Sequence, residues 1–227
     1  MLVILDTETS GFSGGVVELG SVIITDSGER YTFNERCYPI KPIEPGAQKI
    51  HGISMDDVEN CRPQQVVLHE WLSDISELSH IFKEEVVLCA HNLSFDMRML
   101  QQSVDLKGYK SFCSVILARQ ALPDAEKHKL EYLYNHLGFT ETMNAHSALD
   151  DCLMLEAVLM RLLAITSKSY YQVAQEQDLP PKIIPKVTFG KHKGKLFKDL
   201  PLDYLDWVHK NHSCKDAAYT AGVVLGK

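Results

Sequence analysis

The sequence lacks any segment suited to a membrane. None of its apolar runs reaches the roughly 18 residues that a membrane-spanning helix needs. Its first residues also lack the charged stretch followed by a long apolar stretch that marks a secretory signal. These absences argue against a membrane or secreted protein, and we expect a cytoplasmic protein with no membrane partner.

Paired cysteines are missing as well. The six cysteines are scattered singly, with no CxxC pair and no histidine at zinc-finger spacing. Most stand in apolar stretches, which argues against a disulfide framework or a zinc site and predicts buried free thiols. They are Cys37, Cys61, Cys89, Cys113, Cys152 and Cys214.

An excess of positive charge is also absent. Lys and Arg number 23 and Asp and Glu number 30, so the formal net charge is −7. A protein that held nucleic acid by overall charge alone would be basic. Any polyanionic substrate must therefore be bound locally, by metal ions or by a basic patch.

The sequence does contain a clear succession of strands and helices. Short apolar segments predict strands at residues 2–6, 16–25, 31–38 and 86–90. A capping box at Ser54 and Asp57 predicts a short helix. A strand meander followed by one strand and many helices indicates a layered α/β or α+β domain. The longer helices are predicted at 66–82, 94–106, 112–121, 128–137 and 147–165.

The composition changes after residue 166. A helix is predicted at 169–178, and the prolines at 180 and 181 would end it. Residues 182–198 contain six lysines and no acid, and the segment DYLDWVHKN that follows is typical of a helix. We therefore predict a main domain (1–166), a connecting helix with a proline-rich linker (167–185) and a small lysine- and aromatic-rich C-terminal module (186–227).

Two acids stand at the end of the first strand. Asp6 and Glu8 are two residues apart, so their side chains point to the same face with Cα atoms about 6–7 Å apart. Leu2 and Ile4 share that face. An apolar face that ends in two carboxylates suits a metal site, although two solvated acids at a strand end would also explain it.

A third acid follows the next buried strand. In the segment HNLSFD, Ser94 is predicted to cap a helix and Asp96 falls in the first turn. The helix dipole alone favours an acid there by about 0.3–1 kcal/mol. The same position would also bring Asp96 to the edge of the sheet near Asp6 and Glu8.

A histidine and a fourth acid precede the last long helix of the main domain. In the segment NAHSALDD, Ser147 and Asp150 are predicted to form a capping box, which gives Asp150 a structural role. Asp151 then ends the first turn and His146 lies on the incoming loop, so both could face one point. A surface histidine beside an ordinary N-terminal acid is the alternative for this segment alone.

Together these segments resemble the three motifs of the DEDDh superfamily of 3′→5′ exonucleases. In this sequence the motifs are DTET from Asp6, HNLSFD ending at Asp96, and HSALDD ending at Asp151. The segment from His51 to Ile53 also resembles one common in that superfamily. The match spans about residues 1–165, and three motifs in the same order make it specific.

The resemblance implies an α/β, ribonuclease H-like fold, with a mixed sheet flanked by helices and a small C-terminal extension. It also implies that Asp6, Glu8, Asp96 and Asp151 bind two Mg²⁺ ions, for which Mn²⁺ could substitute. His146 would take a proton from the attacking water, and an unperturbed pKa near 6.5 suits that work. Bound cations would also offset the negative charge. Glu18, on the neighbouring strand, is predicted to be a structural acid.

The predicted contacts to nucleic acid lie in the motifs, in an early glycine-rich loop and in the tail. Phe12 in the loop GFSGG would stack on the terminal base or wedge beside it, and burial under its own hairpin is the alternative. Lysines interleaved with aromatic residues suit phosphates and bases, although a solvated loop over a small aromatic core also explains the tail. The predicted contacts are Thr9, Gly11, Phe12, His51, Asn92, Phe95, Lys191 and Lys193.

The predicted function is hydrolysis of DNA from 3′ ends, single-stranded or duplex, with release of nucleoside 5′-monophosphates in repair or recombination. The tail resembles the extension of one exodeoxyribonuclease family, whereas oligoribonucleases and ribonuclease T lack such a tail. Three alternatives stay open: an RNA-trimming exoribonuclease, a polymerase proofreading exonuclease and a non-catalytic nucleic-acid-binding module. We expect a monomer or a homodimer.

Overall fold

A computed structural model describes residues 1–141, 147–181, 183–212 and 214–227. The chain forms two compact units, Met1–Asp178 and Leu179–Lys227. The boundary between these units lies inside the predicted connector at 167–185. The predicted division into a catalytic domain, a linker and a C-terminal module stays a prediction.

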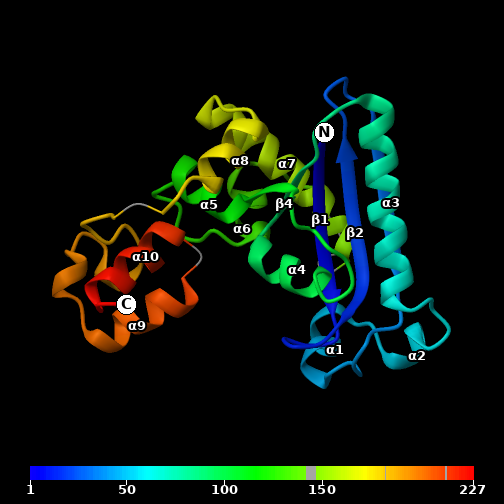
Figure 1. Cartoon of the computed structure of the whole chain (residues 1–227), viewed down its shortest axis with the longest axis horizontal. Coiled ribbons are helices and arrows are strands. Elements are labelled where there is room, and N and C mark those ends of the chain that lie inside the picture. The colour runs from blue at the N-terminus through cyan, green and yellow to red at the C-terminus, as the bar shows by residue number, and fades with distance from the viewer. Residues whose placement is uncertain (142–146, 182, 213) are drawn as a thin grey trace. The chain divides into compact units, whose positions relative to one another are not determined.

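A five-stranded mixed sheet forms the centre of the first unit, in the order β3-β2-β1-β4-β5 (Figure 1). The strands β1 (Leu2–Thr9), β2 (Val16–Ile24) and β3 (Arg30–Arg36) form an antiparallel meander. The strands β4 (Val87–Ala90) and β5 (Lys110–Cys113) extend the sheet in parallel from the other side of β1. The prediction of a mixed sheet flanked by helices is confirmed.

Helices pack against both faces of the sheet. One core contains residues of α3 and α4, and the other contains residues of α5, α6, α7 and α8. Two short helices, α1 and α2, follow β3 along the chain. The bounds are α1 (Pro45–His51), α2 (Met55–Val58), α3 (Gln64–Phe82), α4 (Leu93–Leu100), α5 (Ser114–Ala121), α6 (Leu130–His136), α7 (Ala148–Thr166) and α8 (Tyr170–Asp178).

Strand β1 contributes to both cores, because successive side chains of a strand point to opposite faces. Val3 and Leu5 belong to the core that contains α3 and α4. Leu2 and Ile4 belong to the core that contains α7. At its C-terminal end, the second row of side chains therefore continues into the carboxylates of Asp6 and Glu8.

Several element boundaries differ from the predictions. The helix predicted at 112–121 begins as strand β5 and becomes α5 only from Ser114. The helix predicted at 94–106 ends at Leu100, and α1 was not predicted. Strand β1 runs on to Thr9 because it pairs with β2 over its whole length. A short buried run such as β5 cannot be distinguished from a buried helical turn by periodicity.

The predicted helix caps are partly wrong. Ser54 forms the predicted capping box with Asp57 at the start of α2. At α4 the cap position is Asn92, in a left-handed conformation with φ 81°, so Ser94 lies inside the helix. Asn tolerates this conformation better than most residues, which lets the helix begin earlier. At α7, Ser147 occupies the cap position but accepts no hydrogen bond with its side chain.

The second unit is small and mainly helical. It consists of two short 3-10 helices, η1 (Gly190–His192) and η2 (Phe197–Asp199), followed by α9 (Leu202–Asn211) and α10 (Lys215–Val224). Helix α10 was not predicted. The core of the unit is Val187, Phe197, Leu200, Leu205, Val208, Ala217 and Ala221.

The six cysteines are all free thiols. Four are buried, whereas Cys61 and Cys214 are half-buried, so the prediction of burial is wrong for these two. Among the described residues, no helix is both long and apolar enough to span a bilayer.

Candidate active site

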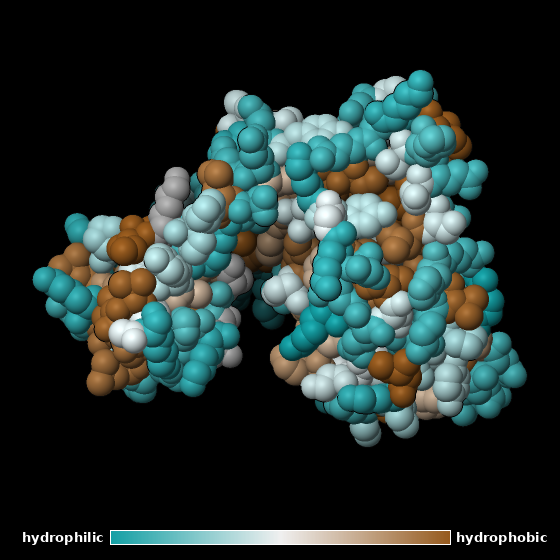
Figure 2. Space-filling model, viewed as in Figure 1, coloured by the Kyte–Doolittle hydropathy of each residue, from teal (hydrophilic) through white to brown (hydrophobic). Residues whose placement is uncertain are grey.

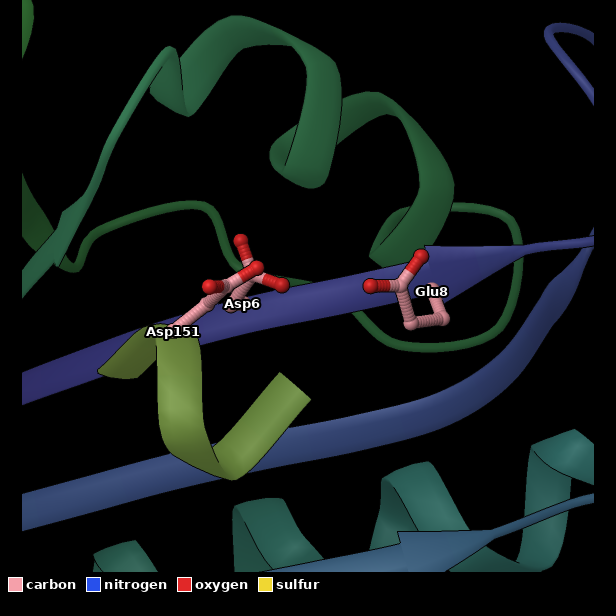
Figure 3. Close-up of side chains that lie close together, drawn as sticks. All are labelled: Asp6, Glu8 and Asp151. Atoms are coloured by element: carbon pink, nitrogen blue, oxygen red, sulfur yellow. The ribbon is translucent and has the colours of Figure 1, made fainter. Parts of the chain in front are cut away.

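Three of the predicted acids meet beside the end of β1. A carboxylate oxygen from each of Asp6, Glu8 and Asp151 lies within 4.8 Å of the other two. Figure 3 shows Asp6 and Glu8 projecting from β1 and Asp151 from the first turn of α7, with the three carboxylates facing one another. Asp151 is more than 140 positions away from Asp6 and Glu8 in the sequence, and the packing of α7 on the sheet brings it to them.

The N-terminus of α7 is fixed on β2 by close backbone packing. A Cβ atom at Gly20 would lie 2.3 Å from the backbone carbon of Ala148 and 2.4 Å from the backbone nitrogen of Leu149. Only glycine therefore fits at this position of β2. The contact holds the first turn of α7, and with it Asp151, against the strand next to Asp6.

Glu18 completes this junction and explains why the predicted capping box is absent. Its Oε1 accepts a hydrogen bond from the backbone N–H of Ala148 at 3.2 Å, so a carboxylate from β2 takes the role expected of Ser147 and Asp150. Its Oε2 forms an ion pair with Arg36 at 3.1 Å. Glu18 is buried and structural, and it also stands close enough to act on the charges of the cluster.

Asp96 is close enough to act on the charges of the group of three but is not a member of it. It is buried in the first turn of α4, and its Oδ1 accepts a hydrogen bond from the Thr7 hydroxyl at 2.8 Å. Among the described residues, the group of mutually close ligand atoms contains Asp6, Glu8 and Asp151, without Asp96. Its charge nevertheless raises the pKa of both Asp6 and Glu8.

Burial and mutual repulsion make these acids hard to ionise. Burial, then the charges of Asp96 and Asp151, raises the pKa of Asp6 well above its usual range. Burial and the neighbouring carboxylates raise the pKa of Glu8 to about 8. Burial raises the pKa of Asp96 to about 7, although the hydrogen bond from Thr7 opposes the shift. Such a cluster needs protons or cations to be stable near neutral pH.

The predicted general base, His146, lies outside the described residues. Helix α7 begins two residues later, at Ala148. The role of His146 therefore stays a prediction.

The glycine-rich loop after β1 exposes Phe12. The side chain of Phe12 is 71% exposed, so the alternative that it is buried under its own hairpin is wrong. Its ring centroid is 6.0 Å from that of Phe95, and the guanidinium carbon of Arg98 lies 4.5 Å from it. Arg98 also donates a hydrogen bond to the backbone carbonyl of Phe12 at 3.2 Å. Helix α4 thus holds the loop at one end of the acidic cluster.

The other predicted contacts near β1 have visible structural partners. His51 Nδ1 accepts a hydrogen bond from the N–H of Ile53 at 3.0 Å, so Nε2 carries the proton and donates it to the carbonyl of Thr9 at 3.2 Å. Gly11 has φ 152°, and a Cβ atom there would meet the Glu44 carboxyl group at 2.4 Å. The predicted roles of His51, Thr9, Gly11, Asn92 and Phe95 in binding nucleic acid are not tested by these contacts.

One positioning residue, Gln64, was missed in the sequence, whereas His91 is the first residue of the predicted HNLSFD motif. Gln64 is fully buried, and its Oε1 accepts hydrogen bonds from the N–H groups of Val16 and Ile40, at 3.0 and 3.2 Å. His91 Nε2 donates to the carbonyl of His128 at 2.8 Å, and burial lowers the pKa of His91 to about 4. A polar residue at a helix start, such as Gln64, gives no sequence signal of such long-range bonds.

The fold and the carboxylate cluster together define a ribonuclease H-like hydrolytic nuclease. A model of the exonuclease family matches residues 3–159, and the chain belongs to this family. The predicted resemblance to the DEDDh exonucleases, and among them to exodeoxyribonuclease X, is confirmed.

Similar proteins cover most of the chain. Exodeoxyribonuclease 10 of Escherichia coli (strain K12) is 30% identical over 217 residues, which is 93% of this chain and 91% of that protein. A DNA polymerase III subunit epsilon-like protein of Rhodobacter capsulatus is 31% identical over 174 residues, which is 71% of this chain but 23% of that protein.

Solved structures show the same fold. The structure of exonuclease X in complex with 5′ overhanging duplex DNA superposes with a TM-score of 0.63 at 28% identity, covering 77% of this chain and 98% of that one. A full-length 3′-exonuclease superposes with a TM-score of 0.60 at 22% identity, covering 72% of this chain and 60% of that one.

Proposed function

We propose that this exonuclease hydrolyses DNA from 3′ ends and releases nucleoside 5′-monophosphates from single and double strands. The observation that carries the proposal is the convergence of buried Glu8 with half-buried Asp6 and Asp151 beside the end of β1. The similarity to exodeoxyribonuclease 10 over 93% of the chain supports DNA as the substrate. Free thiols throughout fit work in a reducing cytoplasm, where repair or recombination would use such an enzyme.

The chemistry of the acidic cluster fits two Mg²⁺ ions, with Mn²⁺ as a substitute. The donors are all carboxylate oxygens, which are the ligands that hard divalent cations prefer. The pKa values of Asp6 and Glu8 are raised by burial and by the neighbouring carboxylates, so ionising the metal-free cluster costs free energy that bound cations would offset. When bound, divalent cations stabilise the charge that develops on the attacking and leaving oxygens of the phosphodiester.

Each residue of the site would have a separate role in the reaction. Asp6, Glu8, Asp96 and Asp151 would hold the cations, and the Thr7 hydroxyl would fix the orientation of Asp96. His146 would take the proton from the attacking water. Glu18 and Gly20 hold α7 on the sheet and thereby position Asp151.

The exposed Phe12 gives the site a means of engaging the terminal base. Its ring contacts Arg98 and Phe95 of α4 and lies in the loop that follows β1, four residues after Glu8. Stacking on a base stabilises a bound strand by about 1–3 kcal/mol. We expect Phe12→Ala to slow cleavage of blunt duplex more than cleavage of a single strand, because a duplex end must also be opened. Equal losses on both substrates would contradict a wedge role.

Two other enzymatic functions have specific support. A solved 3′-exonuclease that recognises a histone mRNA stem-loop shares the fold, which keeps RNA as a candidate substrate. The similarity to polymerase III epsilon subunits, as in Buchnera aphidicola at 29% identity, keeps proofreading as a candidate. A non-catalytic binding module is disfavoured by the convergence of the acids.

Labelled substrates test the proposal. DNA and RNA of one sequence, each labelled at the 3′ or the 5′ end, are incubated with the chain and Mg²⁺, Mn²⁺ or EDTA. We expect immediate mononucleotide release from 3′-labelled DNA, a shortening ladder from 5′-labelled DNA, and no cleavage in EDTA. Early mononucleotide release from the 5′ label, or faster cleavage of RNA than of DNA, would contradict the proposal.

Substitutions in the acidic cluster and at His146 test whether this site performs the cleavage. Asp6→Ala, His146→Ala and Asp151→Asn should each abolish release. Asp150→Asn is the matched control, because Asp150 is an acid in the same first turn of α7 but is not part of the cluster. Cleavage that survives in Asp151→Asn would show that the activity arises elsewhere.

A further inference from the structure

The formal charge of the chain is divided unevenly between its two units. Residues 179–227 contain nine lysines, four aspartates and neither arginine nor glutamate, which gives a formal charge of +5. The whole chain carries −7, so residues 1–178 carry −12. The second unit is therefore the part of the protein that attracts anions, and no motif of the nuclease lies in it.

Within the second unit, one group of lysines is available to a ligand. Lys210 and Lys227 both form ion pairs with Asp206, at 2.7 and 2.6 Å. In contrast, Lys191, Lys193 and Lys195 are exposed around η1 and make no ion pair with any residue that the structure describes. Their charges are not neutralised by the fold, and three like charges within five residues repel one another unless an anion binds.

A row of aromatic rings lies next to these lysines. The Nζ atom of Lys191 is 5.7 Å from the ring centroid of Tyr204, which contacts His192 on one side and Trp207 on the other. Centroid distances along the row are 4.5 Å for His192–Tyr204, 6.0 Å for Tyr204–Trp207, 6.5 Å for Trp207–His212 and 3.7 Å for His212–Phe189.

Trp207 is the most open large ring of this row. Its side chain is 50% exposed, and it lies on α9 three residues after Tyr204. The visible surface of residues 179–227, orange and red in Figure 1, shows hydrophobic side chains between hydrophilic ones (Figure 2). A half-exposed indole beside unpaired lysines suits a ligand that carries both negative charges and flat rings.

We propose that the second unit binds single-stranded nucleic acid, with Lys191, Lys193 and Lys195 on the phosphates and Trp207 stacked on a base. The two features together favour a nucleic acid over a lipid headgroup or an acidic peptide, since only bases offer flat rings for stacking. This site shares no residue with the acidic cluster of the first unit, so it does not depend on the proposed cleavage chemistry. Its function is to hold a strand whether or not that strand is being cut.

A binding assay under conditions that prevent cleavage tests whether the three lysines contact phosphates. The full chain carrying Asp6→Asn is titrated in EDTA against a fluorescent 20-nucleotide thymidine strand, and anisotropy is followed at several salt concentrations. Adding Lys191→Gln and Lys193→Gln should weaken binding about tenfold at low salt and reduce the slope of log affinity against log salt by about 1.4, or about 0.7 per lost phosphate contact. The control is Lys107→Gln with Lys127→Gln, two exposed lysines of the first unit. Equal losses in both pairs, or none in either, would overturn the proposal.

Intrinsic fluorescence tests the stacking independently. The chain has two tryptophans, Trp71 at 0% exposure and Trp207 at 50%, so a bound base can quench only Trp207 by contact. We expect the thymidine strand to quench the parent and to leave Trp207→Phe unchanged. Trp207→Ala should weaken binding about 5- to 150-fold, the loss of one stacked base. Quenching that persists in Trp207→Phe would overturn the proposal.

Two further probes separate nucleic acid from other anions. Polyglutamate of 20 residues offers comparable charge without bases, and vesicles containing phosphatidylserine offer a lipid surface. We expect both to bind at least tenfold more weakly than the thymidine strand and to leave Trp207 emission unchanged. Equal affinity for either probe would show a general anion surface and overturn the assignment to nucleic acid. Cleavage assays do not enter this test, so its failure would leave the proposed exonuclease activity intact.

Discussion

The acids at the end of β1 are stabilised by protons or cations rather than by basic side chains. Among the described residues, no Lys or Arg forms an ion pair with Asp6, Glu8 or Asp96. Their raised pKa values follow from burial and from their mutual repulsion. The same feature that suits cations therefore destabilises the metal-free protein.

The metal-free protein should lose stability as the pH rises from 6.5 to 8. The pKa values of Glu8 and Asp96 in the folded state, about 8 and about 7, exceed those of the unfolded chain. The folded state therefore binds more protons in this range, and its stability falls by about 1.4 kcal/mol per pH unit for each proton that differs. His91 opposes this slope only weakly: it is neutral when folded, with a pKa of about 4, and half protonated at pH 6.5 when unfolded, so it adds about 0.4 kcal/mol of stability between pH 6.5 and 8.

Urea unfolding in EDTA at three pH values measures this slope. Mn²⁺ or Mg²⁺ should flatten it, because bound cations replace the protons and stabilise the folded state by mass action. A free energy of unfolding in EDTA that stays constant or rises between pH 6.5 and 8 would contradict the account.

Removing one charge from the cluster should stabilise the metal-free protein while destroying activity. Asp6→Asn keeps the shape of the side chain and removes one of the repelling carboxylates. In EDTA at pH 8 we expect its free energy of unfolding to rise by about 1–2 kcal/mol. Cleavage with Mg²⁺ should fall on the order of 10³-fold, since cation binding contributes several kcal/mol to the transition state. Asp150→Asn should show neither effect, and a destabilised Asp6→Asn chain would refute the argument.

Among the individual residues of the site, the acids could be predicted from the sequence, whereas the residues that position them could not. The two-residue spacing of Asp6 and Glu8 in a strand fixes their common face from local sequence alone. Glu18 and Gln64 act through hydrogen bonds to residues 130 and 48 positions away. No local pattern records such partners, so Glu18 was predicted to be structural without its partner, and Gln64 was missed.

The position of Asp151 depends on how one helix meets one strand. Helix α7 begins at Ala148, where its backbone touches Gly20 of β2, and its first N–H is capped by Glu18. The hydrophobic pattern of α7 predicted its existence and length. The junction itself was predicted wrongly, because a capping box within the local sequence was preferred to a carboxylate from another strand.

Gly20→Ala should therefore damage both the fold and the site. The added Cβ would meet backbone atoms of α7 at 2.3–2.4 Å, and backbone cannot move aside as a flexible side chain can. We expect a loss of about 1–3 kcal/mol in the free energy of unfolding. Activity should fall about 100-fold even where the chain is folded, since a displacement near 1 Å misplaces Asp151.

Gly46→Ala is the matched control for this substitution. It lies in α1, its added Cβ would have open space around it, and alanine favours a helix. The comparison uses urea unfolding and the initial rate of release from 3′-labelled DNA. Parent-like stability and rate in Gly20→Ala would show that the junction is looser than these distances require.

The whole chain consists of one unit that carries the nuclease motifs and another that carries the positive charge. Each unit has a hydrophobic core of its own among the described residues. The change in composition after residue 166 predicted a main domain, a connector at 167–185 and a C-terminal module, but it could not show that α8 packs with the first unit. Val173 and Ala174 of α8 belong to the core that contains Leu2 and Ile4.

Truncation should distinguish the two boundaries. A chain ending at Asp178 keeps every hydrophobic cluster of the first unit. We therefore expect its free energy of unfolding to lie within about 1 kcal/mol of the value for the first unit in the full chain. A chain ending at Thr166 loses Val173 from the core, and also Gln177, whose amide bonds to the N–H and the carbonyl of Cys113 at 2.9 and 3.1 Å. Those bonds cover the free edge of β5, and their loss together with the lost apolar burial should cost at least about 3 kcal/mol.

Urea unfolding of both chains measures the difference, and release from short 3′-labelled DNA should persist in the longer one. If the chain ending at Thr166 proved equally stable, α8 would belong to the linker, as the composition indicates, and its packing against β5 would contribute nothing to the fold.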